Sequence, residues 1–210
     1  DMRAFFYQRI ERETQNALDG KQAGIVMKVN SLLDYDMIER LYKASQAGVP
    51  IELIVRGICS LVPGVEGVSD HITVRSIVGR FLEHSRIFRF ENAGDPLLYL
   101  GSADLMPRNL DRRVELVFPV EEPKIRARVE AVLAMQLKDT VNARLQGPDA
   151  VYRLQERRGK HNVDSQAALL KLAHEREKQS LAQQEESERF IPRLRAEELM
   201  QNDKGKEAEK

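Results

Sequence analysis

The sequence contains one cysteine, Cys59, which excludes an internal disulfide and is typical of a protein from the reducing cytosol. Acidic and basic residues balance at 33 each, so the overall charge predicts no polyanionic partner and any basic site must be local. No apolar run approaches the ~18 residues that a membrane span requires, and no secretory signal follows Asp1. We therefore expect a cytoplasmic protein without a transmembrane segment, either unattached or peripheral to the inner face of the membrane.

Two common kinds of site are also missing from the sequence. No Gly-x4-Gly-Lys-Ser/Thr phosphate loop occurs, and Gly64-Val-Glu-Gly67 does not replace one. Cys59, His71 and His84 lack the spacing of a zinc site, so we predict no metal site in this chain. Cys59 is interpreted as a small buried hydrophobe rather than a nucleophile.

The most informative stretch, residues 84–104, predicts two short strands joined by an Ala-Gly-Asp-Pro turn. Charged and apolar side chains alternate before the turn, and an apolar run follows it. His84 opens the first strand, and a Gly101-Ser-x-Asp104 loop closes the second. An imidazole and a loop of small residues therefore lie at strand ends, where α/β folds usually place their chemistry.

An earlier segment predicts a βαβ unit. Residues 23–29 form a buried strand rich in β-branched side chains, residues 35–47 form a helix with one apolar face, and residues 50–55 form a second strand. Such a unit pairs its two strands in parallel. A further helix is expected over residues 1–18, where apolar side chains are spaced among charges.

Arg56 directly follows the second strand of this unit. Open α/β sheets bind ligands at the carboxyl ends of parallel strands, and a guanidinium at such a place can grip a phosphate with two parallel hydrogen bonds. Gly57 lets the backbone turn sharply after it. The alternative interpretation is an arginine paired with a surface acid.

The length of 210 residues suffices for one domain with a core, followed by an extension. A strand over residues 113–120 and a helix within 119–138 are expected to complete the domain. Charged residues become denser after Gly147-Pro148, which indicates a boundary there and a domain of residues 1–150.

The extension is expected to have two parts. Residues 151–184 combine a basic loop with a helix over 167–184 that we expect to pack on the domain, and residues 185–210 are expected to form a charged, mobile tail. The start at Asp1 rather than at a methionine suggests a piece of a longer protein.

The spacing in the hairpin resembles a known signature. His84, Arg86 and Glu91, followed by Gly101-Ser-x-Asp104, resemble the His-x-Lys-x4-Asp and Gly-Ser-x-Asn pattern of the phospholipase D-like superfamily, in which the histidine handles a phosphoryl group. Arginine stands here in place of lysine, glutamate in place of aspartate, and aspartate in place of asparagine. The alternative interpretation of the spacing is a histidine at the start of an ordinary β-hairpin.

Further blocks resemble, in order, the C-terminal part of bacterial long-chain polyphosphate kinase. They are Gly24-Ile-Val-Met-Lys28-Val-Asn30-Ser-Leu, Val55-Arg-Gly-Ile-Cys-Ser-Leu-Val-Pro-Gly64, Ser76-Ile-Val-Gly-Arg-Phe-Leu-Glu-His84-Ser-Arg86, Leu100-Gly-Ser-Ala-Asp104-Leu-Met-Pro-Arg108-Asn109 and Asp164-Ser-Gln-Ala. That family carries two phospholipase D-like domains in tandem, and this chain resembles the second over about residues 1–180.

The patterns and the resemblance together predict an α/β fold, a mixed β-sheet flanked by helices of the phospholipase D-like type, with a helical charged C-terminal extension. The resemblance implies a reversible transfer of the terminal phosphate of ATP to inorganic polyphosphate, through a phosphohistidine on an upstream domain that nothing here matches. It places Mg²⁺ in that upstream part, so the isolated chain is expected to be inactive. It also implies that Arg56 contacts the nucleotide phosphates and that His84 is the second active-site histidine.

Other basic residues in the matching blocks are candidates to line a polyphosphate channel, because phosphoryl transfer depends mainly on charge neutralisation and positioning. After Arg56, these are Lys28, Arg86 and Arg108. His84 is expected to act as a general acid or base, or to stabilise the transferring group. The expected partners are ATP or ADP, polyphosphate, the upstream domains and further copies of the enzyme, but no nucleic acid.

Two other functions fit the same fold. One is a non-catalytic module that binds polyanions or nucleic acids and has lost the chemistry. The other is a phosphodiesterase, which needs two histidine motifs and hence a dimer of this chain.

Overall fold

The structure is a computed structural model that describes residues 1–154 and 162–189, with side chains described up to residue 184. Two parts of the predicted extension, residues 155–161 and 190–210, lie outside the described residues. The tail predicted over residues 185–210 therefore stays a prediction.

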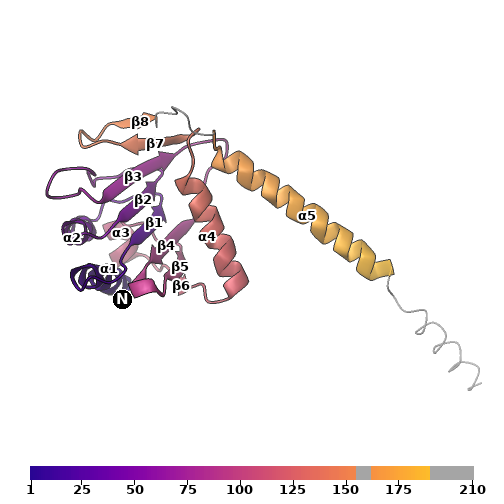
Figure 1. Cartoon of the computed structure of the whole chain (residues 1–210), viewed down its shortest axis with the longest axis horizontal. Helices are drawn as coiled ribbons and strands as arrows, with labels where there is room; N and C mark the ends of the chain where they lie inside the picture. Colours follow the sequence, from indigo (N-terminus) through magenta and orange to yellow (C-terminus); the bar gives the residue numbers. More distant parts are fainter. Residues whose placement is uncertain (155–161, 190–210) are drawn as a thin grey trace, which may run out of the picture. The chain divides into compact units, whose positions relative to one another are not determined.

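A single sheet of eight strands runs through the described residues in the order β6-β5-β4-β1-β2-β3-β7-β8 (Figure 1). The three strands β1, β2 and β3 pair in parallel, and the other neighbouring strands pair antiparallel. The predicted mixed sheet is confirmed, including its βαβ unit and its hairpin. The strands are β1 Ile25–Val29, β2 Ile51–Val55, β3 Ile72–Ile77, β4 Arg86–Phe90, β5 Leu97–Gly101, β6 Val117–Pro119, β7 Ala143–Gln146 and β8 Tyr152–Leu154.

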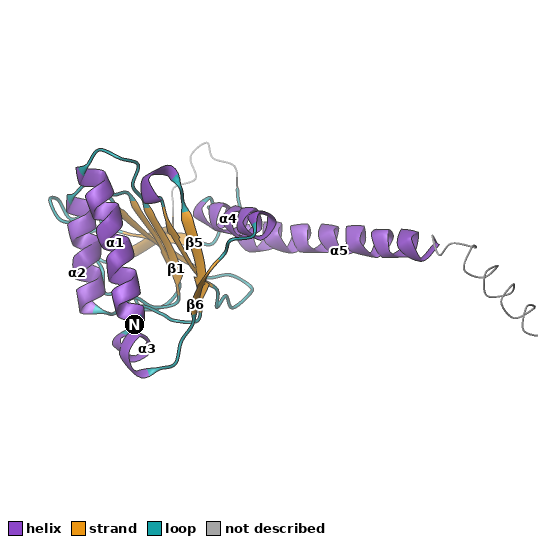
Figure 2. Ribbon diagram, turned by 90° about the horizontal axis from the view of Figure 1, so that it is seen from below, coloured by secondary structure: helices purple, strands orange, loops and turns teal. Residues whose placement is uncertain are grey.

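Helices lie on both faces of this sheet. α1 and α2 cover one face and α4 covers the other (Figure 2). The Asp34 carboxylate caps α2 by accepting a hydrogen bond of 3.0 Å from the backbone of Met37. The helices of this unit are α1 Met2–Leu18, α2 Tyr35–Gln46, α3 Pro107–Arg112 and α4 Pro123–Leu137, with a short 3₁₀ turn at Asn92–Gly94.

The core has two layers because both faces of the sheet are covered. Alternation along β2 sends Leu53 and Val55 toward the apolar cluster that α1 and α2 share, and Ile54 toward the cluster that includes Leu133 of α4. Strands buried on both faces are apolar at successive positions, which explains why the sequence identifies the central strands readily.

The sequence does not predict β3 or the β7–β8 hairpin. Arg75 interrupts the apolar pattern of β3, yet only 8% of it is exposed because Glu52 of β2 pairs with it. The compact unit extends from Asp1 to Gln166, and Gly147-Pro148 lies in the turn between β7 and β8. The strand expected over residues 113–120 is confined to β6.

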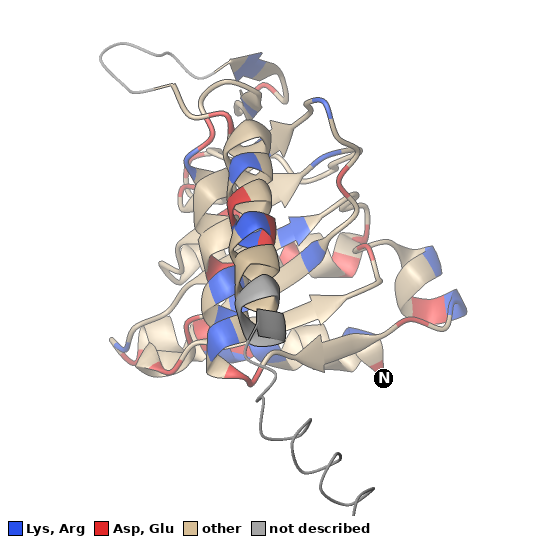
Figure 3. Cartoon of the chain, turned by 90° about the vertical axis from the view of Figure 1, so that its right-hand side faces the viewer, with Lys and Arg blue, Asp and Glu red and all other residues tan. Residues whose placement is uncertain are grey.

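The second unit begins at Ala167 and contains most of α5, Ser165–Arg189. This helix confirms the one predicted over residues 167–184. Figure 3 shows lysine and arginine interspersed with aspartate and glutamate along the chain. Across the described parts, none of the helices has both the length and the hydrophobicity to cross a bilayer.

Candidate active site

The predicted site residues meet at one edge of the sheet. β1 and β2 run in parallel, with Val29 opposite Val55, so their carboxyl ends coincide. β4 runs antiparallel to β1, and its first residue, Arg86, lies opposite Gly101 at the end of β5. The residues that follow β1, β2 and β5 and those that precede β4 therefore share this edge, which we call the site edge.

Arg56 leaves β2 at the site edge and is half-buried. Its Nε donates a hydrogen bond of 3.1 Å to the side-chain oxygen of Asn30, and no carboxylate among the described residues pairs with it. The backbone of Gly57 donates to the Asn30 carbonyl at 2.7 Å. A Cβ atom at Gly57 would lie 2.8 Å from that oxygen, so glycine is needed for the two strand ends to approach this closely.

Asn30 links Arg56 to the loop after β5. Its backbone N–H donates a hydrogen bond of 2.7 Å to Asp104, while its side chain accepts from Arg56. Asn30 is 5% exposed, and its side-chain nitrogen is buried without a partner among the described residues. The side-chain oxygen of Asn30 thus orients Arg56, while the two N–H donors of its amide nitrogen are unused.

Arg86 holds the backbone of His84 in place through a hydrogen bond to its carbonyl. Its guanidinium binds the Asp104 carboxylate through two hydrogen bonds of 3.0 and 3.3 Å, and it donates a third, of 2.8 Å, to the carbonyl of His84. Asp104 is 8% exposed. The charge of Arg86 is therefore neutralised by Asp104, and its geometry is fixed by three bonds.

Lys28 is held in a similar way on the other face of the sheet. It is 4% exposed, and its Nζ lies 3.1 Å from the Glu83 carboxylate and 3.4 Å from the carbonyl of Ser85. Burial lowers the pKa of Lys28, and the nearby Glu83 carboxylate opposes this effect. Strand alternation sends Lys28 toward α4 and Arg86 toward α1 and α2.

His84 itself is exposed at the site edge. None of the described residues hydrogen-bonds to its ring, whereas its backbone carbonyl is fixed by Arg86. Arg108 lies on the exposed side of α3, directly after the loop that contains Asp104, and has no ion-pair partner among the described residues. The imidazole and this guanidinium are therefore both accessible from solvent.

The charges at the site edge are unequally compensated. Lys28 is paired with Glu83 and Arg86 with Asp104, whereas Arg56 is held by a neutral amide. In the part of the chain that the structure describes, no cluster of three histidine, cysteine, aspartate or glutamate side chains could hold a metal ion. The arrangement leaves one oriented, uncompensated guanidinium at the same edge of the sheet as an accessible imidazole.

Sequence reasoning alone does not identify Asn30 and Glu83 as parts of this edge. Both stand inside the quoted blocks, Asn30 two residues after Lys28 and Glu83 directly before His84. Their position in those blocks is the signal that could have identified them.

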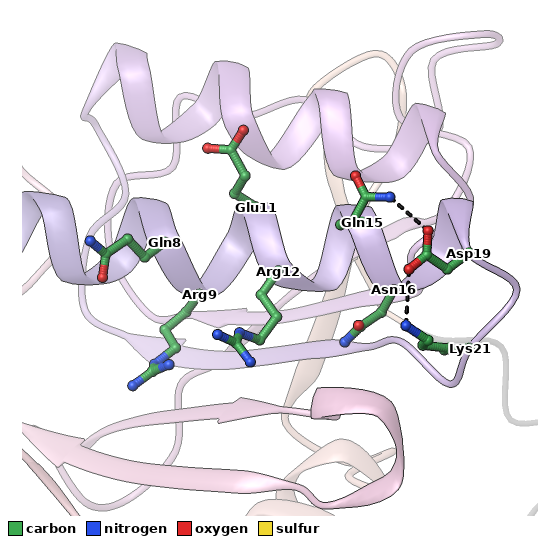
Figure 4. A pocket seen from close by; sticks show the side chains of 8 residues that line it. All are labelled: Gln8, Arg9, Glu11, Arg12, Gln15, Asn16, Asp19 and Lys21. Carbon is green, nitrogen blue, oxygen red and sulfur yellow. Dashed lines mark hydrogen bonds and ion pairs between the residues drawn. The ribbon is translucent and has the colours of Figure 1, made fainter.

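A separate open pocket of about 560 Å³ runs along α1 (Figure 4). Arg9, Arg12 and Lys21 point to the same side of the helix there, and Lys21 pairs with Asp19 at 3.0 Å. The pocket contains none of the predicted site residues, and α1 leads into the amino end of β1, at the opposite edge of the sheet. It is therefore distinct from the candidate active site.

Comparison with known proteins gives consistent matches. The family model described as polyphosphate kinase C-terminal domain 2 matches residues 1–166. The polyphosphate kinase of Lactiplantibacillus plantarum is 47% identical over 174 residues, which is 83% of this chain and 24% of that protein, and the one of Pseudomonas putida is 54% identical over 162 residues, 77% of this chain and 22% of that protein. The chain thus spans about a quarter of the length of the curated relatives it matches.

Solved structures match as well. The crystal structure of polyphosphate kinase from Porphyromonas gingivalis superposes with a TM-score of 0.80 at 38% identity, over 85% of this chain and 27% of that chain. A phospholipase D family member, Nuc from Salmonella typhimurium, has a TM-score of 0.45 at 14% identity, over 64% of this chain and 88% of that chain.

Proposed function

Because the chain belongs to the polyphosphate kinase family, with its compact unit corresponding to the second C-terminal domain, we propose that it forms part of the active site of an ATP:polyphosphate phosphotransferase. The reaction moves the terminal phosphate of ATP reversibly to a growing polyphosphate chain, through a phosphohistidine on an upstream domain. The matched relatives are named as kinases, so the non-catalytic binding module is not favoured.

The uncompensated guanidinium of Arg56 is the observation that carries this proposal. A cation that is oriented by Asn30 but not neutralised can give two parallel hydrogen bonds to a phosphate. Arg56 also lies at the carboxyl end of a parallel strand, where α/β sheets bind ligands. Its role is to grip the phosphates of ATP or ADP.

His84 supplies the second function of the site. A solvent-accessible imidazole can donate or accept a proton near neutral pH. Its role is that of a general acid or base, or of a stabiliser of the transferring group, beside the phosphohistidine of the upstream domain. The bond from Arg86 to the His84 carbonyl supports this role, because it fixes the backbone from which the ring projects.

The other basic residues predicted for the site have two different roles in this proposal. Lys28 and Arg86 are engaged by carboxylates, and these contacts support a role in holding the site edge rather than in contacting the polymer. The exposure of Arg108 on α3 supports a role for this member of the predicted channel set in contacting polyphosphate. Phosphoryl transfer depends on such charge neutralisation and positioning.

Mg²⁺ is assigned to residues outside this chain. The carboxylates of Glu83 and Asp104 are occupied by Lys28 and Arg86, and the nearby Glu115 accepts hydrogen bonds from Ser102 and Asn109, so none of them fits the oxygen-rich coordination that Mg²⁺ requires. The upstream domains of the enzyme are accordingly partners of this chain, and we infer assembly of several copies of the whole enzyme.

The test uses the full-length enzyme with Arg56→Ala, Arg56→Lys and His84→Ala. Arg56→Ala should weaken nucleotide binding and slow transfer together, by ~2–4 kcal/mol of transition-state stabilisation. Arg56→Lys should recover little, because a point charge lacks the two-pronged geometry. His84→Ala should lower kcat with little change in nucleotide affinity.

Arg153→Ala is the matched control, because Arg153 is an exposed arginine in the β7–β8 hairpin that pairs with Asp149. Its kinetics should equal those of the wild type. Near-normal turnover of His84→Ala, or unchanged nucleotide affinity of Arg56→Ala, in enzymes with wild-type melting temperature would contradict the proposed roles.

A further inference from the structure

The loop that presents His84 crosses the site edge. Residues 78–85 connect β3 to β4, and in the sheet order these strands flank β1 and β2. The loop must therefore pass the carboxyl ends of β2 and β1, a distance of three strand spacings or ~14 Å. Eight residues can span up to ~26 Å, so the length of the loop does not fix its position.

The backbone of the loop does not fix its position either. Residues 79–84 form no backbone-to-backbone hydrogen bond with the described parts of the chain. All side chains of residues 78–85 are exposed except Glu83, which is partly buried. A loop with these properties is mobile unless side chains from elsewhere hold it.

Gln166 holds the middle of this loop. Its side-chain oxygen accepts a hydrogen bond of 2.8 Å from the backbone N–H of Phe81, and its nitrogen donates one of 2.9 Å to the Phe81 carbonyl. The same nitrogen donates a bond of 2.8 Å to Glu83. Gln166 is 6% exposed, so these bonds are shielded from water.

Glu83 holds the end of the loop, next to His84. One of its oxygens accepts from Gln166, and the other accepts from the side chain of Gln136 in α4 and pairs with Lys28 of β1. Gln136 is 1% exposed and Lys28 is 4% exposed. The carboxylate therefore ties the residue before His84 to the sheet and to α4 at the same point.

Gln166 is itself rigidly placed. The preceding residue, Ser165, donates to the Asp139 carboxylate from its backbone at 2.8 Å and from its hydroxyl at 2.6 Å. Asp139 is fully buried and also accepts from the backbone of Asn142 and Ala143. The Ser-Gln pair of the Asp164-Ser-Gln-Ala block thus connects the core to the His84 loop.

We propose that Gln166 and Glu83 are positioning residues for His84, which set the place of its loop across the site edge. The inference rests on the proposed role of His84. Gly79 is part of the same contact, because a Cβ atom there would lie 2.5 Å from the Gln166 side-chain oxygen and would displace that side chain.

The first experiment measures the full-length enzyme with Gln166→Glu and Glu83→Gln. Gln166→Glu keeps the size of the side chain but removes both donated bonds and places two carboxylates together. Each variant should lower kcat by about 10- to 100-fold, the effect of displacing a catalytic group by about 1 Å. The KM for ATP should stay within about twofold, because Arg56 is held independently by Asn30.

Gln146→Ala is the matched control. Gln146 is a buried glutamine of β7 that accepts a hydrogen bond from Tyr152 and makes no contact with the loop. It should lose stability without the selective loss of kcat. Lower kcat with unchanged KM in enzyme that is folded at the assay temperature, compared with unchanged kcat in the destabilised Gln146→Ala enzyme, separates positioning from folding.

A double-variant cycle with Gly79→Ala and Gln166→Ala tests the contact directly. Gly79→Ala alone should lower kcat by displacing Gln166. In the Gln166→Ala background, where no side chain remains to be displaced, Gly79→Ala should have little further effect. Additive losses would show that the two residues act separately and would overturn the proposal.

Measuring His84→Ala alongside these variants separates a failure of the positioning role from a failure of the proposed function. If His84→Ala abolishes turnover while Gln166→Glu and Glu83→Gln keep wild-type kcat, the positioning role is wrong and the proposed function stands. If His84→Ala itself retains turnover, the proposed role of His84 is wrong, and the positioning role that rests on it is wrong as well.

Discussion

At the scale of single residues, the acceptor that holds Arg56 decides what the site edge can bind. Asn30 orients the guanidinium without cancelling its charge, whereas Glu83 and Asp104 neutralise Lys28 and Arg86. The chain therefore has an uncompensated positive charge at the site edge, although its formal net charge is zero. An anion meets an attractive and already oriented donor there, which limits the entropy lost on binding.

Asn30→Asp in the full-length enzyme tests this arrangement. A carboxylate in place of the amide would pair with Arg56 and compete with the nucleotide phosphates for it. We expect ATP binding to weaken by ~1–3 kcal/mol, the range for losing a hydrogen bond to a charged group, with a smaller change in kcat. Steady-state kinetics and nucleotide titration measure both quantities.

Gln46→Glu serves as control, because it adds the same charge on the exposed side of α2, near the opposite edge of the sheet. An unchanged affinity for ATP in folded Asn30→Asp enzyme would mean that Arg56 does not contact the phosphates.

The position of Arg56 at the end of a parallel strand could be predicted because its signals are local. A strand end followed by a glycine is visible within a few positions. The roles of Asn30 and Glu83 depend on partners far away in the sequence, Asp104 for the first and Gln136 and Gln166 for the second. No periodicity or spacing links such positions to their partners, so these contacts became visible only in three dimensions, even though both residues stand inside the quoted blocks.

At the scale of elements, the junction between α4 and α5 is organised by one buried carboxylate. Burial raises the pKa of Asp139, but hydrogen bonds from Ser165, Asn142 and Ala143 outweigh this effect and leave the pKa below its usual value. A depressed pKa means that the charged form stabilises the fold above the unfolded-state pKa, and that this stability is lost as the pH falls through the folded-state pKa.

Asp139→Asn should therefore lower the free energy of unfolding by ~1.5–3 kcal/mol at neutral pH, because an amide cannot satisfy the same donors. The difference from the wild type should shrink in acid, as the pH falls from the ordinary aspartate pKa of 3.8 through the lower folded-state pKa of Asp139. Urea unfolding of the 210-residue chain near pH ~7 and near pH ~3 measures it.

Asp36→Asn, at an exposed carboxylate in the first turn of α2, should show no such pH-dependent loss. A loss for Asp139→Asn that is equal at both pH values would assign the effect to shape rather than to charge.

Element prediction succeeded where burial is uniform and failed where polar side chains are buried in pairs. The central strands β1 and β2 and the helix α2 follow simple apolar patterns. In β3, Arg75 is buried in an ion pair with Glu52. In β7, alanine and leucine alternate with arginine and glutamine. Tertiary pairing outweighs local pattern at such positions.

At the scale of the whole molecule, the chain contains only part of the proposed active site. It spans about a quarter of its curated relatives, and the resemblance places the phosphohistidine outside it. We expect the purified 210-residue chain to fold cooperatively and to make no polyphosphate from radiolabelled ATP, with the full-length enzyme as the positive control. Polymer synthesis by the isolated chain would show that a complete site exists within it.

The pairing of β1 with β4 has a consequence for how the protein acquires its site. The β1-α2-β2-β3 segment and the β4-β5 hairpin each rest mainly on contacts between neighbours in the sequence, whereas Lys28 and Ile87 pair across a long stretch of chain. Such non-local pairings form late, because closing the intervening chain costs entropy before any contact is gained. Arg56 and His84 lie on the two sides of the β1–β4 pairing, so a nascent chain assembles the proposed phosphate-binding edge only when the two halves have joined.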